Sequence, residues 1–314
     1  YRKKSSLRIK DQSRIQSLIK EELTDRLRIQ ELVRPNERPN VPIQAFKIKN
    51  LLEIEDVADE VRVNWELGKK EIASITNVLE SNLIHVMGID AHSDFDGISV
   101  IAKSENEVRG VGVVARKGIC GERQKLNIAH ELGHLVLKPI EGLDEEKAAF
   151  RFGAAFLAPK GWIIAEVGAK RTSLDTEELF ILKKKSGLSV AALLYRLKDL
   201  EIISDSYYRD CFKTISRWGW RKEEPHSLPS EENEWLKQNV RKALSEGLIS
   251  QPEAEKLIGE KIETKVSLSL QKIRSIMNLS LEERRKVLAD EAEKISEFYK
   301  EQADDLWQSG DFVE

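Results

Sequence analysis

The sequence predicts an α+β protein that is mainly helical, with a small three-stranded sheet and a helical C-terminal extension. Of its 314 residues, 33% are charged and only 6% are aromatic, and the charged set is rich in Glu and Lys. Such a composition is typical of helical proteins. Most long segments place apolar residues at helical spacing, whereas three short β-branched segments between residues 83 and 118 partly alternate and are bounded by turn residues.

The N-terminal part is expected to be helical. Residues 11–33 carry apolar side chains at helical spacing, and two prolines within residues 34–40 then indicate a linker. We expect residues 1–40 to be an N-terminal helix and linker that remain after a missing upstream domain. Two further helices are predicted at residues 53–68 and 69–82.

The sheet is expected to come next in the chain. Three strands are predicted at residues 83–89, 97–104 and 110–118. The connections between them are short, which favours an antiparallel arrangement. A helix is then expected over about residues 124–138, where Pro139 ends it.

The remainder of the central domain is expected to be helical. A helix is predicted at residues 145–158, with Asp144 as its N-cap and Pro159 at its end. Residues 176–200 predict two helices separated by a break at Gly187.

The C-terminal region is expected to be helical as well. Residues 217–229 indicate a loop, and residues 230–314 are expected to be helical throughout. Ser280 and Glu283 have the spacing of a capping box, which predicts a helix start. The expected domains are residues 1–40, the central domain 41–228, and the C-terminal region 229–314 with a distinct tail from about residue 279.

Bulk properties argue against several protein classes. The net charge is −3 and the pI is about 6.1, so bulk electrostatics do not indicate nucleic acid binding. Cys120 and Cys211 are too few for a disulfide framework, which favours a reducing, cytoplasmic location. No apolar run approaches the ~18 residues of a membrane helix, so we expect no membrane partner.

The stretch NIAHELGHLVL, at residues 127–137, contains two histidines four residues apart. On a helix, His130 and His134 lie on the same face and can direct their ring nitrogens at one metal ion. Zinc accepts such nitrogens at about 2.0–2.1 Å. Glu131 lies about 100° round the helix axis, where it can hold a water molecule and take its proton. This is the arrangement of the zincins, with two histidine ligands and a glutamate as general base.

A catalytic zinc needs a third protein ligand and one open position for water. The nearby acidic candidates are Glu141, Asp144, Glu145 and Glu146. Glu146 lies within one turn of the apolar face of its predicted helix and is preferred, with Glu145 as second choice. We expect one zinc ion per chain and metal-assisted hydrolysis of a peptide bond. A chance match to the motif and a metal site without activity are the alternatives.

The segments RQKLNIAHELGHLVL and DEEKAAFRFGAAFLAPK resemble the ImmA/IrrE family of metallo-endopeptidases. The residues that match the family pattern are Arg123, Ala129 to His134, Glu146, Ala149, Phe152, Leu157 and Pro159. The resemblance implies a minimal zincin fold, Glu146 as third zinc ligand, and a helix-turn-helix transcriptional repressor as substrate, in a phage or toxin–antitoxin type locus. Phe150 departs from the pattern, because the family commonly has Asn there. Members often carry an Xre-type helix-turn-helix domain upstream, so DNA contact is expected only through such a missing domain or indirectly.

The tail from about residue 279 resembles the toxin-binding tail of small type II antitoxins. The expected anchors for a toxin partner are Leu281, Phe298, Leu306 and Trp307. An ordinary solvated amphipathic helix is the alternative interpretation. The second functional hypothesis is therefore a non-catalytic antitoxin or regulatory binding protein with a structural or vestigial metal site.

Other polar residues have weaker indications of function. Tyr195 and His226 are candidate donors to the oxyanion of a tetrahedral intermediate. Residues 183–185 form a run of three lysines within a helix–turn–helix outline and would suit phosphate contacts, although a solvated basic face is the commoner reason for such a run. Cys120 could bind the metal in a latent form, but buried packing is its default.

Overall fold

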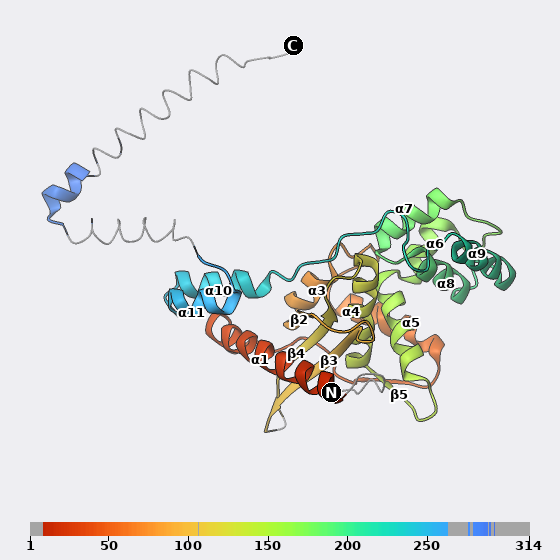
Figure 1. Ribbon diagram of the computed structural model, residues 1–314, viewed down its shortest axis with the longest axis horizontal. Helices are drawn as coiled ribbons and strands as arrows, with labels where there is room; N and C mark the ends of the chain where they lie inside the picture. Colours follow the sequence, from red (N-terminus) through yellow and green to blue (C-terminus); the bar gives the residue numbers. More distant parts are fainter. Residues whose placement is uncertain are drawn as a thin grey trace, which may run out of the picture. The chain divides into compact units, whose positions relative to one another are not determined.

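The computed structural model describes residues 9–105 and 107–262, together with residues 276, 279–287, 289 and 292. The chain divides into two compact units, residues 1–258 and 259–314. The first unit is α+β and mainly helical, which confirms the predicted fold class (Figure 1). Its N-terminal and central helices are α1 (Ile9–Val33), α2 (Ile54–Asn64), α3 (Ile75–Ser81), α4 (Gly121–Val136) and α5 (Glu145–Leu157). The helices that follow are α6 (Lys160–Val167), α7 (Thr176–Ser186), α8 (Val190–Asp199), α9 (Asp205–Arg217), α10 (Trp235–Ser245) and α11 (Gln251–Ile258).

The three predicted strands form one sheet, but its topology differs from the expected one. The strands are β2 (Ile84–Ile89), β3 (Gly97–Ser104) and β4 (Glu107–Arg116), in the order β2-β4-β3. β3 pairs antiparallel with β4, whereas β2 pairs parallel with β4, so the antiparallel prediction is wrong for that pair. β4 is the longest of the three strands, is buried from Gly110 to Ala115, and takes the centre. β3 ends in exposed residues and lies at an edge.

A second, two-stranded parallel sheet was not predicted. β1 (Phe46–Ile48) pairs with β5 (Leu137–Pro139), and a short 3-10 helix, η1 (Leu51–Glu53), follows β1. Residues 137–139 come directly after α4, so the helix ends at Val136 rather than at residue 138. This pairing fixes the C-terminal end of α4 to the segment that precedes α2.

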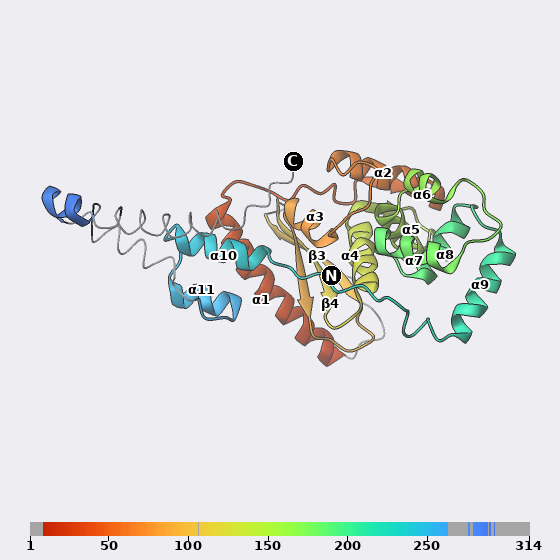
Figure 2. The ribbon, with the colours of Figure 1, turned by 90° about the horizontal axis from the view of Figure 1, so that it is seen from above.

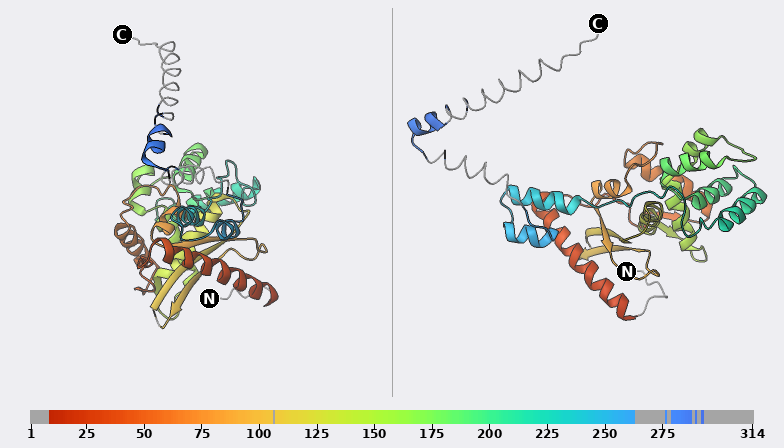
Figure 3. Two further views of the ribbon diagram at one scale, coloured as in Figure 1. Left: turned by 90° about the vertical axis from the view of Figure 1, so that its left-hand side faces the viewer. Right: turned by 45° about the horizontal axis from the view of Figure 1, so that its top comes forward.

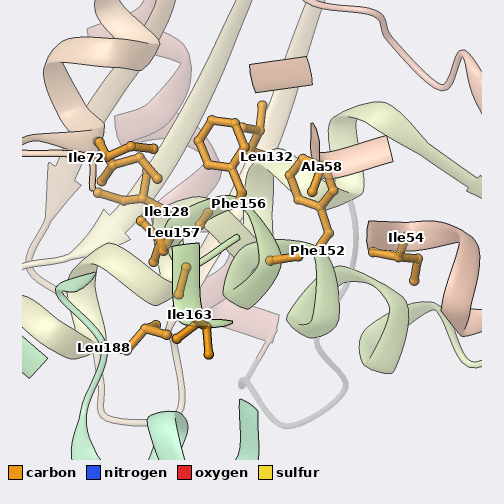
Figure 4. Close-up of a cluster of buried hydrophobic side chains, with 14 of the residues drawn as sticks. Ile54, Ala58, Ile72, Ile128, Leu132, Phe152, Phe156, Leu157, Ile163 and Leu188 are labelled. Atoms are coloured by element: carbon orange, nitrogen blue, oxygen red, sulfur yellow. The ribbon is translucent and has the colours of Figure 1, made fainter. Parts of the chain in front are cut away.

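Helices cover both faces of the larger sheet (Figure 2). On one face, apolar residues of α1 such as Ile19 and Leu23 pack against Met87, Ile98 and Val114. The other face belongs to the main core, to which α4 and α5 contribute. Figure 4 shows part of this core; the labelled residues from α2, α4 and α5 are Ile54, Ala58, Ile128, Leu132, Phe152, Phe156 and Leu157. The motif helix α4 is therefore held between the sheet and α5.

The end of the first unit packs back on its beginning. α10 lies against α1 and α11 lies against α10 (Figure 3). A salt bridge joins Arg28 of α1 to Glu253 of α11. Among the described residues, no helix is both long and apolar enough to cross a membrane.

Two of the predicted helices are shorter than expected. Residues 69–74 are not helical, because buried Arg62 donates to the carbonyls of Gly68 and Lys70, and α3 starts only after Ser74. Residues 230–234 are also non-helical. There, the carboxylate of Glu231 accepts bonds from the first backbone N–H groups of α3 at 2.8–3.1 Å and caps that helix.

In the second unit, the described residues 279–287 contain the predicted capping box. The N–H of Ser280 donates to the Glu283 carboxylate at 3.0 Å, and the N–H of Glu283 donates to the Ser280 hydroxyl at 3.4 Å. Leu281 is 65% exposed in the helix that follows. The other expected toxin anchors, Phe298, Leu306 and Trp307, lie outside the described residues.

Candidate metal centre

Helices α4 and α5 approach each other closely because glycines lie at their contact. A Cβ atom on Gly133 of α4 would lie 3.0 Å from the Cα of Ala149 on α5. A Cβ atom on Gly153 of α5 would lie 3.0 Å from the backbone nitrogen of His130. Any larger residue would push the helices apart. The two glycines thus bring the first turns of α5 within reach of the imidazoles of α4.

Three side chains from these helices converge. The Nε2 atoms of His130 and His134 lie 3.0 Å apart. The two carboxylate oxygens of Glu146 lie 3.3 Å from Nε2 of His130 and 3.4 Å from Nε2 of His134. The histidines are one turn apart on α4, and Glu146 lies in the first turn of α5, so the structure brings together the three ligands expected from the sequence.

The donor set and its spacing fit a zinc ion. In a tetrahedral site with bonds of about 2.0–2.1 Å, neighbouring ligand atoms lie roughly 3.3 Å apart. The separations in the cluster, 3.0 Å between the histidine nitrogens and 3.3 or 3.4 Å from each nitrogen to a Glu146 oxygen, are close to this value. The histidine side chains are 7% exposed, whereas the side chain of Glu146 is 55% exposed. An ion at this position would be held by buried nitrogens and would remain open toward solvent on the side of the glutamate.

The other acidic candidates have different surroundings. The carboxylate of Asp144 accepts a bond from the N–H of Lys147 at 3.0 Å and caps α5, as predicted. Glu145 lines a cleft beside the cluster, and Glu141 is exposed. Within the described part of the chain, Glu146 is therefore the acidic residue that joins the two histidines.

Glu131 lies where α4 faces the start of strand β3. The residue is 6% exposed. Its Cγ and Oε1 atoms are each 3.1 Å from the point where a Cβ atom on Gly97 would lie. The missing side chain of Gly97 thus makes room for the carboxylate, which the sequence places one residue after His130.

A cleft of about 610 Å³ extends to His134. Its walls come from β3, from β5 and from the adjoining parts of α4 and α5. The polar and charged residues that line it are Gln44, Ser99, Lys103, His134, Lys138 and Glu145. A hollow of about 700 Å³ between residues 170–172 and 198–205 is larger but includes no residue of the cluster. The cleft beside His134 is therefore the better candidate for a substrate site.

Tyr195 and His226 have other partners. Tyr195 is 52% exposed on α8, where its ring lies near Tyr208 and beneath Lys198. His226 packs edge-on against Phe180 of α7, with the ring centroids 4.9 Å apart. These contacts do not involve the cluster residues, and the expected role of both side chains as oxyanion donors stays a prediction.

His85, His92 and Cys120 lie apart from the metal cluster, and only the first of them is buried. His85 is buried, and its Nε2 atom lies 2.9 Å from Oε1 of Gln30. Burial, with a smaller contribution from the charge of Arg26, lowers the pKa of His85 to about 3. His92 is exposed, and Cys120 is an exposed residue directly before α4, so the expectation that Cys120 is buried is wrong.

Lys183, part of the basic run, is buried rather than available for phosphate contacts. Its Nζ atom lies 2.6 Å from a carboxylate oxygen of Glu122 and 2.8 Å from one of Glu224. Burial alone would lower the pKa of Lys183, but the two carboxylates raise it above its ordinary value. Because Glu122 lies in the first turn of α4, this network anchors the start of the motif helix.

A second buried ion network holds α5 in place. The guanidinium of Arg196 on α8 donates to both carboxylate oxygens of Glu55 on α2, at 2.5 and 2.6 Å. Arg151 of α5 lies 3.3 Å from Glu55 and 2.7 Å from Asp199. The sequence alone gave no sign of these pairs, since they join residues up to 141 positions apart.

The fold and the cluster define the class of this domain: an α+β metallopeptidase-type domain built around an HExxH helix. Residues 121–198 match the family model described as Peptidase_M78, IrrE N-terminal-like domain. The matched residues extend from α4 to α8 and include the whole cluster. The match supports the resemblance of these residues to the ImmA/IrrE family. The comparison with curated proteins finds no match for this chain.

Proposed function

We propose that this protein is a zinc-dependent endopeptidase that cleaves a protein substrate. The observation that carries the proposal is the convergence of His130, His134 and Glu146 beside a buried carboxylate, Glu131. A closed structural zinc site has four protein ligands, whereas this cluster has three. The partly exposed Glu146 leaves one side of the cluster accessible.

Each residue has a role that follows from its position. The two histidines and Glu146 would hold the ion. Zinc supplies Lewis acidity and makes water a nucleophile near neutral pH. Glu131, held between α4 and Gly97, would accept the proton of the attacking water and return it to the leaving amine. Burial of Glu131 among protein atoms keeps its carboxylate oriented.

An extended peptide is the substrate shape that suits the cleft. β3 lies at the edge of its sheet, and Ser99 and Lys103 line the cleft next to His134. A strand edge offers backbone groups to a polypeptide irrespective of its sequence. The family likeness supports a helix-turn-helix repressor as the natural substrate, encoded in a phage or toxin–antitoxin type locus. A toxin partner for the C-terminal tail stays a prediction.

The test compares two variants on a candidate repressor. Glu131→Gln keeps the three ligands, so it should bind zinc as the wild type does while cleavage falls by at least about 100-fold. His134→Ala removes a ligand and should lose both zinc and cleavage. Cleavage by Glu131→Gln at the wild-type rate would show that the assignment of the general base is wrong.

A further inference from the structure

An aromatic ring borders the metal cluster on one side. Phe150 lies one turn after Glu146 on α5, so both side chains project from the same face of that helix. Its ring centroid is 4.0 Å from that of His130, and the two ring planes are inclined by 44°. One face of Phe150 therefore covers the imidazole of a candidate ligand.

The rest of this ring is open to solvent. Phe150 is 48% exposed, whereas the other two phenylalanines of α5, Phe152 and Phe156, are fully buried in the main core. Packing of the core thus does not account for the position of Phe150. Binding sites are lined largely by hydrophobic and aromatic side chains, and Phe150 presents such a ring beside the candidate active site.

The two sides of the cluster differ in chemistry. The cleft reaches His134, and its walls combine charged and hydrogen-bonding side chains such as Lys103 and Lys138 with apolar ones such as Leu137. Phe150 is not part of this cleft and contacts His130, one helical turn away from His134. A polypeptide that passes over the cluster would meet a mixed wall with charged groups on one side and an aromatic face on the other.

We propose that Phe150 forms an apolar subsite that selects a bulky aliphatic or aromatic substrate residue beside the scissile bond, on the side of His130. This inference rests on the proposed peptidase function. Such a residue would cover the exposed part of the ring and remove apolar surface from water. The cleft side, in contrast, accepts polar and charged residues, because its wall carries lysines and a carboxylate.

The first experiment profiles cleavage of a degenerate peptide library by the zinc-loaded full chain. Leu, Ile, Met and Phe should be enriched about tenfold over Gly, Ser and Asp on one side of the cleaved bond only. Phe150→Ala should lose most of this enrichment, whereas Phe150→Leu should keep it. Lys103→Ala changes the opposite wall and is the matched control, in which the apolar preference should persist.

The second experiment measures binding rather than turnover. Peptide hydroxamates that differ only in Leu or Gly, placed on either side of the hydroxamate, are titrated into the zinc-loaded protein. In one of the two placements the Leu compound should bind the wild type about tenfold more tightly, and Phe150→Ala should reduce the difference to about twofold or less.

The outcomes separate the subsite from the proposed function. If the wild type cleaves no peptide, the peptidase proposal fails, and hydroxamate binding still tests the subsite. An equal preference in wild type and Phe150→Ala, with zinc fully bound in both, would overturn the inference. Loss of zinc from Phe150→Ala would overturn it as well, because the ring would then support His130 instead of the substrate.

Discussion

Replacement of Gly153 by alanine tests whether the closeness of α4 and α5 builds the metal centre. A Cβ atom there would lie 3.0 Å from the nitrogen of His130 and 3.2 Å from the carbonyl carbon of Ala129. Optimal separations are about 3.5–4.0 Å, so the helices must part by roughly 0.5 Å. The atoms in the way belong to the backbone of a helix and cannot rotate aside. Overpacking of this kind costs typically about 1–3 kcal/mol.

Helix propensity alone predicts that the same substitution stabilises the protein. Alanine in the interior of a helix is favoured over glycine by about 1 kcal/mol, so a loosely packed site would be stabilised. We expect the packing penalty to exceed this gain and the metal-free Gly153→Ala protein to lose about 1–2 kcal/mol. Because Glu146 and His130 lie on the separated helices, zinc affinity should fall about 10- to 100-fold.

The assay combines urea unfolding of the metal-free protein with a competitive zinc titration. Gly161→Ala is the matched control, since it also replaces a helical glycine, and its nearest heavy atom lies at an ordinary 3.9 Å. That variant should be as stable as the wild type or slightly more stable, with unchanged zinc affinity. The reasoning is refuted if Gly153→Ala is also stabilised and binds zinc normally.

The remaining predictions concern buried charges. Lys183→Met leaves two buried carboxylates without their cation and should lower the free energy of unfolding by about 3–5 kcal/mol. The control Lys184→Met replaces an exposed lysine and should change it by less than about 0.5 kcal/mol. Equal effects of the two substitutions in urea unfolding would count against the network. The pKa of His85 falls to about 3 through burial, so the unfolded chain binds a proton that the folded chain does not, and stability should drop below pH 6.5. His85→Gln should remove about 2 kcal/mol of that drop between pH 6.5 and 5. Burial raises the pKa of Glu80 to about 7, so the wild type, compared with Glu80→Gln, should lose stability as pH rises from about 4.5 to 7. A difference in the free energy of unfolding between the two proteins that does not change with pH would contradict this.

Local rules in the sequence predicted the part of the site that lies within one helix. The spacing of His130 and His134 and the cap at Asp144 depend only on helix geometry and on hydrogen bonds to neighbouring residues. The preference for Glu146 followed from the apolar face of α5, and it is this carboxylate that reaches both imidazoles. Family likeness selected the same residue.

The features that were missed depend on contacts between distant segments. Short connections favour antiparallel neighbours, but the central position of β4 depends on the burial of its residues 110–115 between two layers of helices. The helix predicted from residue 69 starts only at Ile75, because the guanidinium of Arg62 binds the carbonyls of Gly68 and Lys70. The exposure of Phe150 likewise could not be predicted from the sequence. An apolar residue in a helix with an apolar face is expected to be buried, whereas Phe150 is 48% exposed.

The most direct test of the metal centre is the zinc content of three purified proteins. Wild type and Glu131→Gln should each contain about one zinc ion per chain, and His134→Ala should contain close to none. The same zinc content in all three, or none in the wild type after dialysis against zinc, would contradict the assignment of His130, His134 and Glu146 as ligands.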